Sequence, residues 1–258
     1  MYRSFNSLFF SDSKTIHKKN DVLFEFIDES KIPVWQYEQK DMEFFVEYFS
    51  SNFDYSYLDG AARIICELSY GAFDILVYAW LSELPIEGAI AAFGKNILAA
   101  VQSAGCLEEK RRLAWQAAQD RGDPNTLTVL SAAGKAAHEA HKMMGFLRFL
   151  PNKNGEFIAK CEPDHFVLPA FGDCFTARFG ETAWSIIDEK RQLCLRRLPQ
   201  GSVKIMKINP AETSCVESDE WESLWKHYHQ TINNEDRNNP NLQRQFMPKR
   251  YWKYLPEM

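Results

Sequence analysis

The 258-residue sequence lacks the short motifs that identify most enzyme classes. It contains no GxGxxG, P-loop, GxSxG or HExxH segment, so no standard nucleotide cradle, nucleophile elbow or zinc-protease helix is indicated. None of its six cysteines belongs to a CxxC pair, which argues against a zinc ribbon or a cysteine-bound iron–sulfur cluster. A Ser/His/Asp triad cannot be assembled from spacing alone. The residues therefore identify no enzyme and predict no cofactor.

Long apolar runs are also missing. The most apolar stretch, residues 71–105, is interrupted by four charged side chains and a proline, as expected of buried helices and not of a membrane span. The first five residues are not followed by a long apolar run, so no secretory signal is expected. Six scattered thiols without a targeting segment fit a reducing compartment. We therefore expect a cytoplasmic protein with no membrane partner.

An excess of positive charge is absent from the chain as a whole. Lys and Arg number 30 and Asp and Glu number 35, a formal net charge of −5 that argues against a nucleic-acid partner. The charge is nevertheless polarised along the chain. Residues 1–130 carry −7, residues 131–258 carry +2, and residues 237–258 alone carry +4. A surface that faces nucleic acid therefore remains open for the second half.

Hydrophobic periodicity predicts an α+β fold with a helical N-terminal half, residues 1–122. One short strand is predicted at residues 21–27, and Asp41 is predicted to cap the first helix. Further helices are predicted over residues 55–83, with a break near residues 70–71, and then over residues 85–105 and 107–121.

The α+β module is assigned to residues 123–258, and a single compact unit made of both regions is the alternative. Asp123 and Pro124 are a strong helix start. That helix should run to about Met144 with a stripe made of Leu127, Leu130, Gly134, Ala137, His141 and Met144. A mainly antiparallel sheet flanked by helices is predicted from strands at residues 145–150, 156–161, 182–187, 192–198 and 202–208, with a hairpin turn at residues 152–155. A helix should run from Pro169 to about Phe179, and Ser218 should cap a last helix with the stripe Trp221, Leu224, Trp225, Tyr228 and Ile232.

Histidines and carboxylates form the first candidate site. His138 and His141 are three residues apart on one predicted helix, and the polar loop after the second strand contains Glu162, Asp164 and His165. His141, Asp164 and His165 could act as acid and base, or the histidines could share a metal with a loop ligand. Equally, His141 could be a buried, hydrogen-bonded histidine, and the loop could simply cap the following helix. No metal site is assigned.

Basic side chains form the second candidate site. On predicted strands they lie beside aromatic residues, and the tail interleaves cations with Phe246, Tyr251, Trp252 and Tyr254, a mixture that can hold phosphates and stack bases. The alternative is a solvated face with its aromatic rings folded back onto the core. The candidate nucleic-acid contacts are Arg148, Lys160, Arg178, Arg196, Lys204, Arg244, Lys249, Arg250, Trp252 and Lys253.

Three segments resemble a bacterial family described as DNA repair or DNA metabolism proteins, whose C-terminal module is called domain of unknown function 4130. They are GKAAHEAHKMMGFLRF (134–149), EPDHFVLPAFGDCFTARFGETAWSIID (162–188) and LWKHYHQTINNEDRNNPNLQRQFMPKRYWKYLPE (224–257). The resemblance is strong over residues 130–258 and looser before them. It supplies no catalytic residues.

The resemblance implies a nucleic-acid context. The module also occurs fused to uracil-DNA glycosylases of the uracil-crosslinking type, and stand-alone members tend to be encoded beside a radical S-adenosylmethionine protein. The glycosylase's own motifs are not visible in this sequence. Our leading hypothesis is a DNA-binding accessory in DNA repair or base modification that acts with such a radical enzyme. There are two alternatives. One is a hydrolytic DNA-processing enzyme of the nuclease or glycosylase-like type, and the other is a protein scaffold without nucleic-acid contact.

Overall fold

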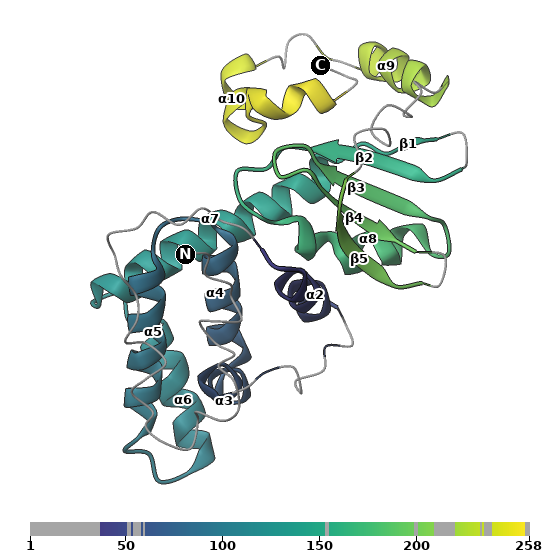
Figure 1. Ribbon diagram of the computed structural model, residues 1–258. Helices are drawn as coiled ribbons and strands as arrows, with labels where there is room; N and C mark the ends of the chain where they lie inside the picture. Colours follow the sequence, from purple (N-terminus) through teal and green to yellow (C-terminus); the bar gives the residue numbers. More distant parts are fainter. Residues whose placement is uncertain are drawn as a thin grey trace. The chain divides into compact units, whose positions relative to one another are not determined.

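A computed structural model describes residues 37–50, 53, 58, 60–152, 155–198, 201–208, 220–232, 234 and 239–255, without the side chains of residues 220–222. The chain divides into two compact units (Figure 1). The helical unit extends to Glu139 and also includes residues 165–167, whereas the α+β unit comprises residues 140–164 and the chain from Leu168 onward. This confirms the α+β class. The division falls inside a helix, while the predicted boundary at residues 122–123 lies just before that helix.

The helical unit contains α2 (Gln39–Tyr48), α3 (Gly60–Leu68), α4 (Tyr70–Leu81), α5 (Glu87–Val101), α6 (Leu107–Ala118) and the first part of α7 (Pro124–Phe146). The predicted break between α3 and α4 is confirmed, because the Ser69 hydroxyl accepts a hydrogen bond from the Ala72 amide and caps α4. Helices α4 and α6 pack closely at Gly71, where a Cβ atom would lie 2.8 Å from the Trp115 ring. Among the described helices, none is both long and apolar enough to cross a bilayer.

Helix α7 begins as predicted but buries a different face. The Asp123 carboxylate accepts a hydrogen bond from the Thr126 amide at 2.7 Å, which caps the helix. Leu127 is 49% exposed and His141 is exposed, so the predicted apolar stripe is wrong. The buried face is one residue displaced and consists of Thr126, Val129, Ala132, Ala133, Ala136, Glu139, Ala140 and Met143. Alanines permit close helix packing, and this outweighs the larger side chains of the predicted stripe.

The α+β unit is built on a five-stranded sheet in the order β1-β2-β3-β4-β5. The strands are β1 (Leu150–Pro151), β2 (Phe157–Cys161), β3 (Trp184–Asp188), β4 (Leu193–Arg197) and β5 (Val203–Lys207). Only β2 and β3 are parallel, and the other three neighbouring pairs are antiparallel. A mainly antiparallel sheet was therefore predicted correctly. The connection between β2 and β3 includes η3 (Leu168–Phe171) and α8 (Gly172–Phe179).

The sheet has two faces of different character. Helix α8 covers the first face, which we call the α8 face. The Phe179 ring stacks on the Phe157 ring with their centroids 5.1 Å apart, and the centroids of the Phe175 and Trp184 rings are 6.2 Å apart. The opposite face holds the buried cluster of Ile158, Ile187 and Cys194, together with the basic side chains discussed below. The chain ends in α9 (Glu220–Ile232), α10 (Pro240–Phe246) and the short helix η6 (Lys249–Tyr254).

Three local predictions need correction. Residues 145 and 146 end α7, so the strand predicted at residues 145–150 shrinks to β1, because helix hydrogen bonding continues through Phe146. Asp41 is buried in the first turn of α2, whose N-cap is Glu38. The stripe of α9 forms on a helix as predicted, yet Leu224, Tyr228 and Ile232 are more than half exposed. The strand predicted at residues 21–27, and the cap Ser218, lie outside the described residues.

Candidate functional site

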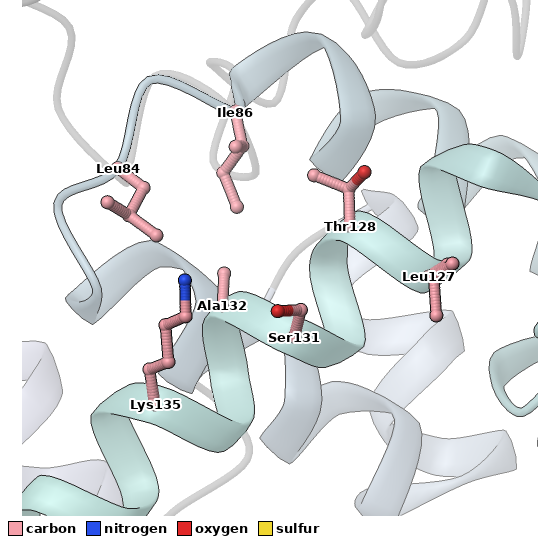
Figure 2. Close-up of a pocket in the computed structure, with 7 residues that line it drawn as sticks. All are labelled: Leu84, Ile86, Leu127, Thr128, Ser131, Ala132 and Lys135. Atoms are coloured by element: carbon pink, nitrogen blue, oxygen red, sulfur yellow. The ribbon is translucent and has the colours of Figure 1, made fainter.

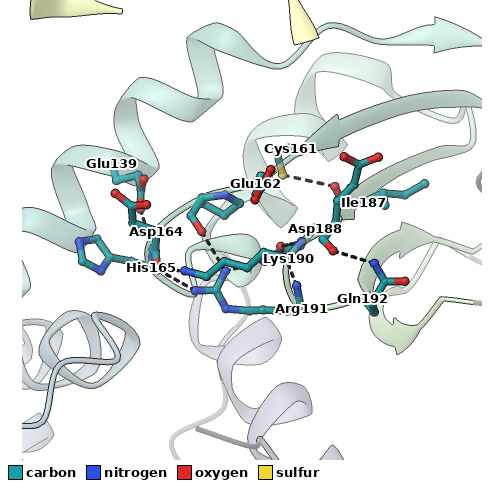
Figure 3. A network of polar contacts seen from close by, with 12 residues as sticks. Glu139, Cys161, Glu162, Asp164, His165, Ile187, Asp188, Lys190, Arg191 and Gln192 are labelled. Carbon is teal, nitrogen blue, oxygen red and sulfur yellow. Dashed lines mark hydrogen bonds and ion pairs between the residues drawn. The ribbon is translucent and has the colours of Figure 1, made fainter. Parts of the chain in front are cut away.

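The loop that contains Glu162, Pro163 and Asp164 is held by the turn between β3 and β4 (Figure 3). The Arg191 guanidinium donates hydrogen bonds to the carbonyls of Pro163 at 3.1 Å and Asp164 at 2.9 Å, and its Nη1 forms an ion pair with Asp188 at 2.8 Å. Lys190 Nζ also donates to the Asp164 carbonyl at 2.9 Å. Two cations thus fix the backbone of the loop, and the carboxylates of Glu162 and Asp164 lie at the surface.

Those two carboxylates pair with the C-terminal turn η6. Arg250 Nη1 lies 2.7 Å from Asp164 Oδ2, and Lys253 Nζ lies 2.5 Å from Glu162 Oε2. The hydrogen bond from Lys253 and its charge hold the pKa of Glu162 below the usual range. Tyr254 donates a hydrogen bond to Glu189 at 2.7 Å, and its burial is the main reason that its phenol pKa is raised. The loop and the tail therefore form one charged surface.

Helix η6 sorts its aromatic and basic residues to different sides. Tyr251 is 2% exposed and packs on Phe146 with ring centroids 5.6 Å apart, and Leu255 just beyond the helix is buried as well. The Trp252 indole is half-buried and donates to the Met247 carbonyl at 2.9 Å. By contrast, Lys249, Arg250 and Lys253 are exposed. We call these three residues the η6 cations.

Three further candidate cations share the opposite face of the sheet. The strand register places Ser185, Arg196 and Lys204 in one row across β3, β4 and β5, and Lys160 lies in the next row beside Ile187. Arg196 Nε lies 3.2 Å from Glu156, and Lys160 Nζ lies 3.7 Å from Glu189. Lys204 is exposed. The strand register thus brings Lys160, Arg196 and Lys204 to one face of the sheet, and carboxylates accompany two of them.

The remaining candidate cations make local contacts. Arg148 donates to the Gly145 carbonyl at 2.8 Å, and Arg178 lies over the Phe179 ring at 5.9 Å. Arg244 donates to the Pro240 carbonyl at 3.0 Å within α10.

The three acid–base candidates have separate environments. His141 is exposed on α7, and Asp164 is paired with Arg250. His165 Nδ1 lies 2.7 Å from the Ser82 carbonyl and must donate to it, while the His165 amide donates to Glu139 at 2.8 Å. His165 therefore ties residues 165–167 to the helical unit. Across the described ranges, no group of three or more His, Cys, Asp or Glu side chains is placed to hold a metal ion.

The sequence analysis missed the residues that hold this surface together, Asp188, Glu189 and Arg191. A signal was present, because Asp188 directly follows the strand predicted at residues 182–187, and three more charged residues separate it from the next predicted strand. The Asp188 carboxylate accepts hydrogen bonds from the amides of Lys190 at 3.0 Å and Arg191 at 3.1 Å, as Asp does in tight turns.

The helical unit contains a pocket of about 310 Å³ that none of the predicted site residues lines (Figure 2). Its wall is mainly apolar, with the Lys135 side chain pointing across it toward Leu84. Its remaining lining residues are Ile86, Leu127, Thr128, Ser131 and Ala132.

Comparison with protein families gives one result. Residues 102–257 match the family described as Domain of unknown function (DUF4130), which spans the whole described α+β unit and begins before α6. Neither the curated proteins nor the solved structures yielded a significant match to the chain.

Proposed function

Because the chain belongs to the DUF4130 family, whose description assigns no activity, we propose that it is a DNA-binding accessory of DNA repair or base modification. The geometry supports the DNA contact, and the sequence resemblance supports the repair context. The proposed contact surface is formed by the η6 cations. DNA is an acidic polymer, and proteins bind it chiefly by placing Lys and Arg side chains at its phosphates.

The arrangement of η6 is the observation that carries this proposal. Tyr251 and Leu255 anchor the turn by burial, so Lys249, Arg250 and Lys253 are presented from a fixed base. Lys249 Nζ lies 5.8 Å from the Trp252 ring centroid, which leaves a half-exposed aromatic surface beside the cations. A cation next to an aromatic ring suits a phosphate and a neighbouring base.

The ion pairs of this surface are compatible with phosphate binding. In the Arg250–Asp164 pair the two side chains are 47% and 53% exposed. Exposed pairs of this kind contribute about 0.2–1 kcal/mol. A phosphate can therefore replace Asp164 as the partner of Arg250 at little energetic cost.

Fluorescence anisotropy with a labelled single strand and a labelled duplex tests the proposal. The Lys249→Gln/Lys253→Gln variant should bind more weakly and show a salt slope reduced by about two, since each phosphate contact contributes about 0.9 for duplex DNA. Arg111→Gln/Arg112→Gln, which removes two exposed cations from α6, is the matched control and should bind like the parent protein. Equal affinity of both variants, or salt-insensitive binding by the parent, would contradict the proposal.

A radical S-adenosylmethionine protein is the partner that we propose for this accessory. The support is the family resemblance of residues 134–149, 162–188 and 224–257. Co-purification of the two proteins, with DNA present and with DNA removed by nuclease, tests the partnership. Absence of a complex under both conditions would contradict it without affecting the DNA-binding proposal.

A further inference from the structure

Arg197 is a buried cation with too few hydrogen-bond acceptors. Its side chain, at the end of β4, is only 9% exposed, and its Nε and Nη1 atoms are buried without a hydrogen-bond partner. The carboxylate paired with it, Glu181, lies 4.0 Å from Nη2 and is fully exposed, so water screens its charge. A buried guanidinium with unmet donors is unfavourable unless something else accepts its hydrogen bonds.

A second buried donor without a hydrogen-bond partner lies on the same face of the sheet. Ser185 pairs with Arg196, which places Trp184 beside Arg197 on the α8 face. The Trp184 indole Nε1 is buried and has no hydrogen-bond partner. The indole nitrogen and the guanidinium can both only donate hydrogen bonds. Neither group can therefore accept a hydrogen bond from the other.

Helix α8 adds the third donor. It crosses the row that contains Trp184 and Arg197: a Cβ atom at Gly172 would lie 3.7 Å from Val203, the ladder partner of Arg197, and Phe175 packs on Trp184. Thr176 is one turn after Gly172, and its hydroxyl is also buried without a partner. On the α8 side of the sheet, the described residues thus include a guanidinium, an indole and a hydroxyl that are each buried without a hydrogen-bond partner.

Gly201, a residue without a side chain, lies next to the Nη2 atom of the Arg197 guanidinium. A Cβ atom at Gly201 would be 3.9 Å from Arg197 Nη2, and Gly201 is exposed with a φ of +84°. A non-glycine residue would be strained at that φ. A ligand can therefore approach Arg197 over Gly201, beside the exposed Glu181 carboxylate.

We propose that Arg197 binds a phosphate-type oxyanion, either inorganic phosphate or a terminal phosphate group of a larger molecule. The planar guanidinium can bind two phosphate oxygens at once, and the unprotonated oxygens of the oxyanion are acceptors, which the Arg197 guanidinium lacks. This site uses none of the η6 cations. It therefore goes beyond the proposed DNA contact surface and does not depend on it.

Thermal unfolding of the full chain with inorganic phosphate, compared with chloride at equal ionic strength, tests the site. At ten times the Kd, phosphate should raise the Tm of the parent protein by roughly 3–6 °C. Arg197→Met should abolish this phosphate-dependent rise. Lys207→Met, which removes an exposed cation from β5, is the matched control and should keep it.

A second variant covers the case in which Arg197→Met does not fold. Arg197→Lys keeps the charge but cannot form bidentate hydrogen bonds to phosphate. The phosphate Kd of this variant should therefore rise by roughly tenfold. A 5′-phosphorylated oligonucleotide and its unphosphorylated counterpart, compared in the same assay, separate free phosphate from a terminal nucleic-acid phosphate. The site is refuted if phosphate and chloride give the same Tm for the parent protein, or if the Arg197 variants retain the full shift. Either result leaves the anisotropy test of the η6 cations unaffected.

Discussion

Arg191 Nη1 lies 2.8 Å from the Asp188 carboxylate, and the same guanidinium donates to the carbonyls of Pro163 and Asp164. The Asp188 side chain is fully buried and the Arg191 side chain is 10% exposed. This buried pair therefore joins the turn between β3 and β4 to the loop that presents Glu162 and Asp164. The shape of the charged surface depends on it.

Replacing Arg191 should destabilise the α+β unit strongly. Arg191→Met leaves the Asp188 carboxylate buried without its cation, and breaking a buried pair in this way typically costs about 3–5 kcal/mol. Lys190→Met removes an exposed neighbour with one hydrogen bond to the same loop and should change the free energy of unfolding by less than about 1 kcal/mol. Urea unfolding measured for both variants checks the difference, and equal values for the two would refute this role for the pair.

Neutralising Asp164 should strengthen DNA binding. Asp164→Asn removes a negative charge that competes with phosphate for Arg250, and one unit charge at about 4 Å in water is worth about 1 kcal/mol, or roughly fivefold in affinity. The gain should shrink as salt is added, because exposed charges are screened. Anisotropy titrations at low and high salt measure it. Unchanged or weaker binding at low salt would show that phosphate does not compete with Asp164.

Neutralising Asp74 should stabilise the helical unit at neutral pH. Burial raises the pKa of Asp74 above its ordinary value, although Tyr48, which donates a hydrogen bond to it at 3.0 Å, opposes the shift. A raised pKa in the folded state means that stability is greatest below the unfolded-state pKa and declines as pH rises through the folded-state pKa. Asp74→Asn removes this decline, and its amide oxygen can still accept from Tyr48.

The Tm of Asp74→Asn should therefore exceed that of the parent protein at pH 7, and the difference should diminish toward pH 4. Thermal melts across this range provide the measurement. A difference that grows on acidification would show that the Asp74 carboxylate stabilises the fold in its charged form.

The thiols should react in two classes. Cys106 and Cys174 are exposed, whereas Cys66, Cys161 and Cys194 are buried, and burial raises the pKa of Cys66 to about 12. At pH 8 a thiol of that pKa is ionised to roughly one part in 10⁴, and the thiolate is the reactive form. In a Cys215→Ser background, two thiols should react rapidly with Ellman's reagent and three only after denaturation. Rapid reaction of a third thiol in the native protein would contradict this assignment.

Much of the fold follows from local sequence signals. The Asp123 cap gives the start of α7, and alternating strands with clear turns give β2 to β5. The buried face of α7 could not be predicted in the same way, because both sides of the helix carry apolar residues. Periodicity weights Leu127 and Met144 above alanine, whereas close packing selects the alanine side.

The sequence indicates the cations of the charged surface but not the carboxylates that pair with them. The η6 cations stand out because they cluster along the chain. Their partners do not stand out in the sequence. Lys253 pairs with Glu162, which is 91 positions away, and Arg250 pairs with the similarly distant Asp164. The spacing of residues along the chain carries no information on such contacts. The excess positive charge of the last residues is thus partly balanced by carboxylates from the loop after β2.

The one parallel strand pair sets an order of events for the folding of the sheet. Strands β3, β4 and β5 are joined by short turns, so their pairing closes small loops, whereas β2 can join β3 only after the long connection through η3 and α8 has closed. Contacts between distant residues form more slowly than local ones because closing a long loop loses more chain entropy. We therefore expect the β3–β4–β5 meander to form early, and the loop that bears Glu162 and Asp164 to be among the last parts of the sheet to acquire its shape.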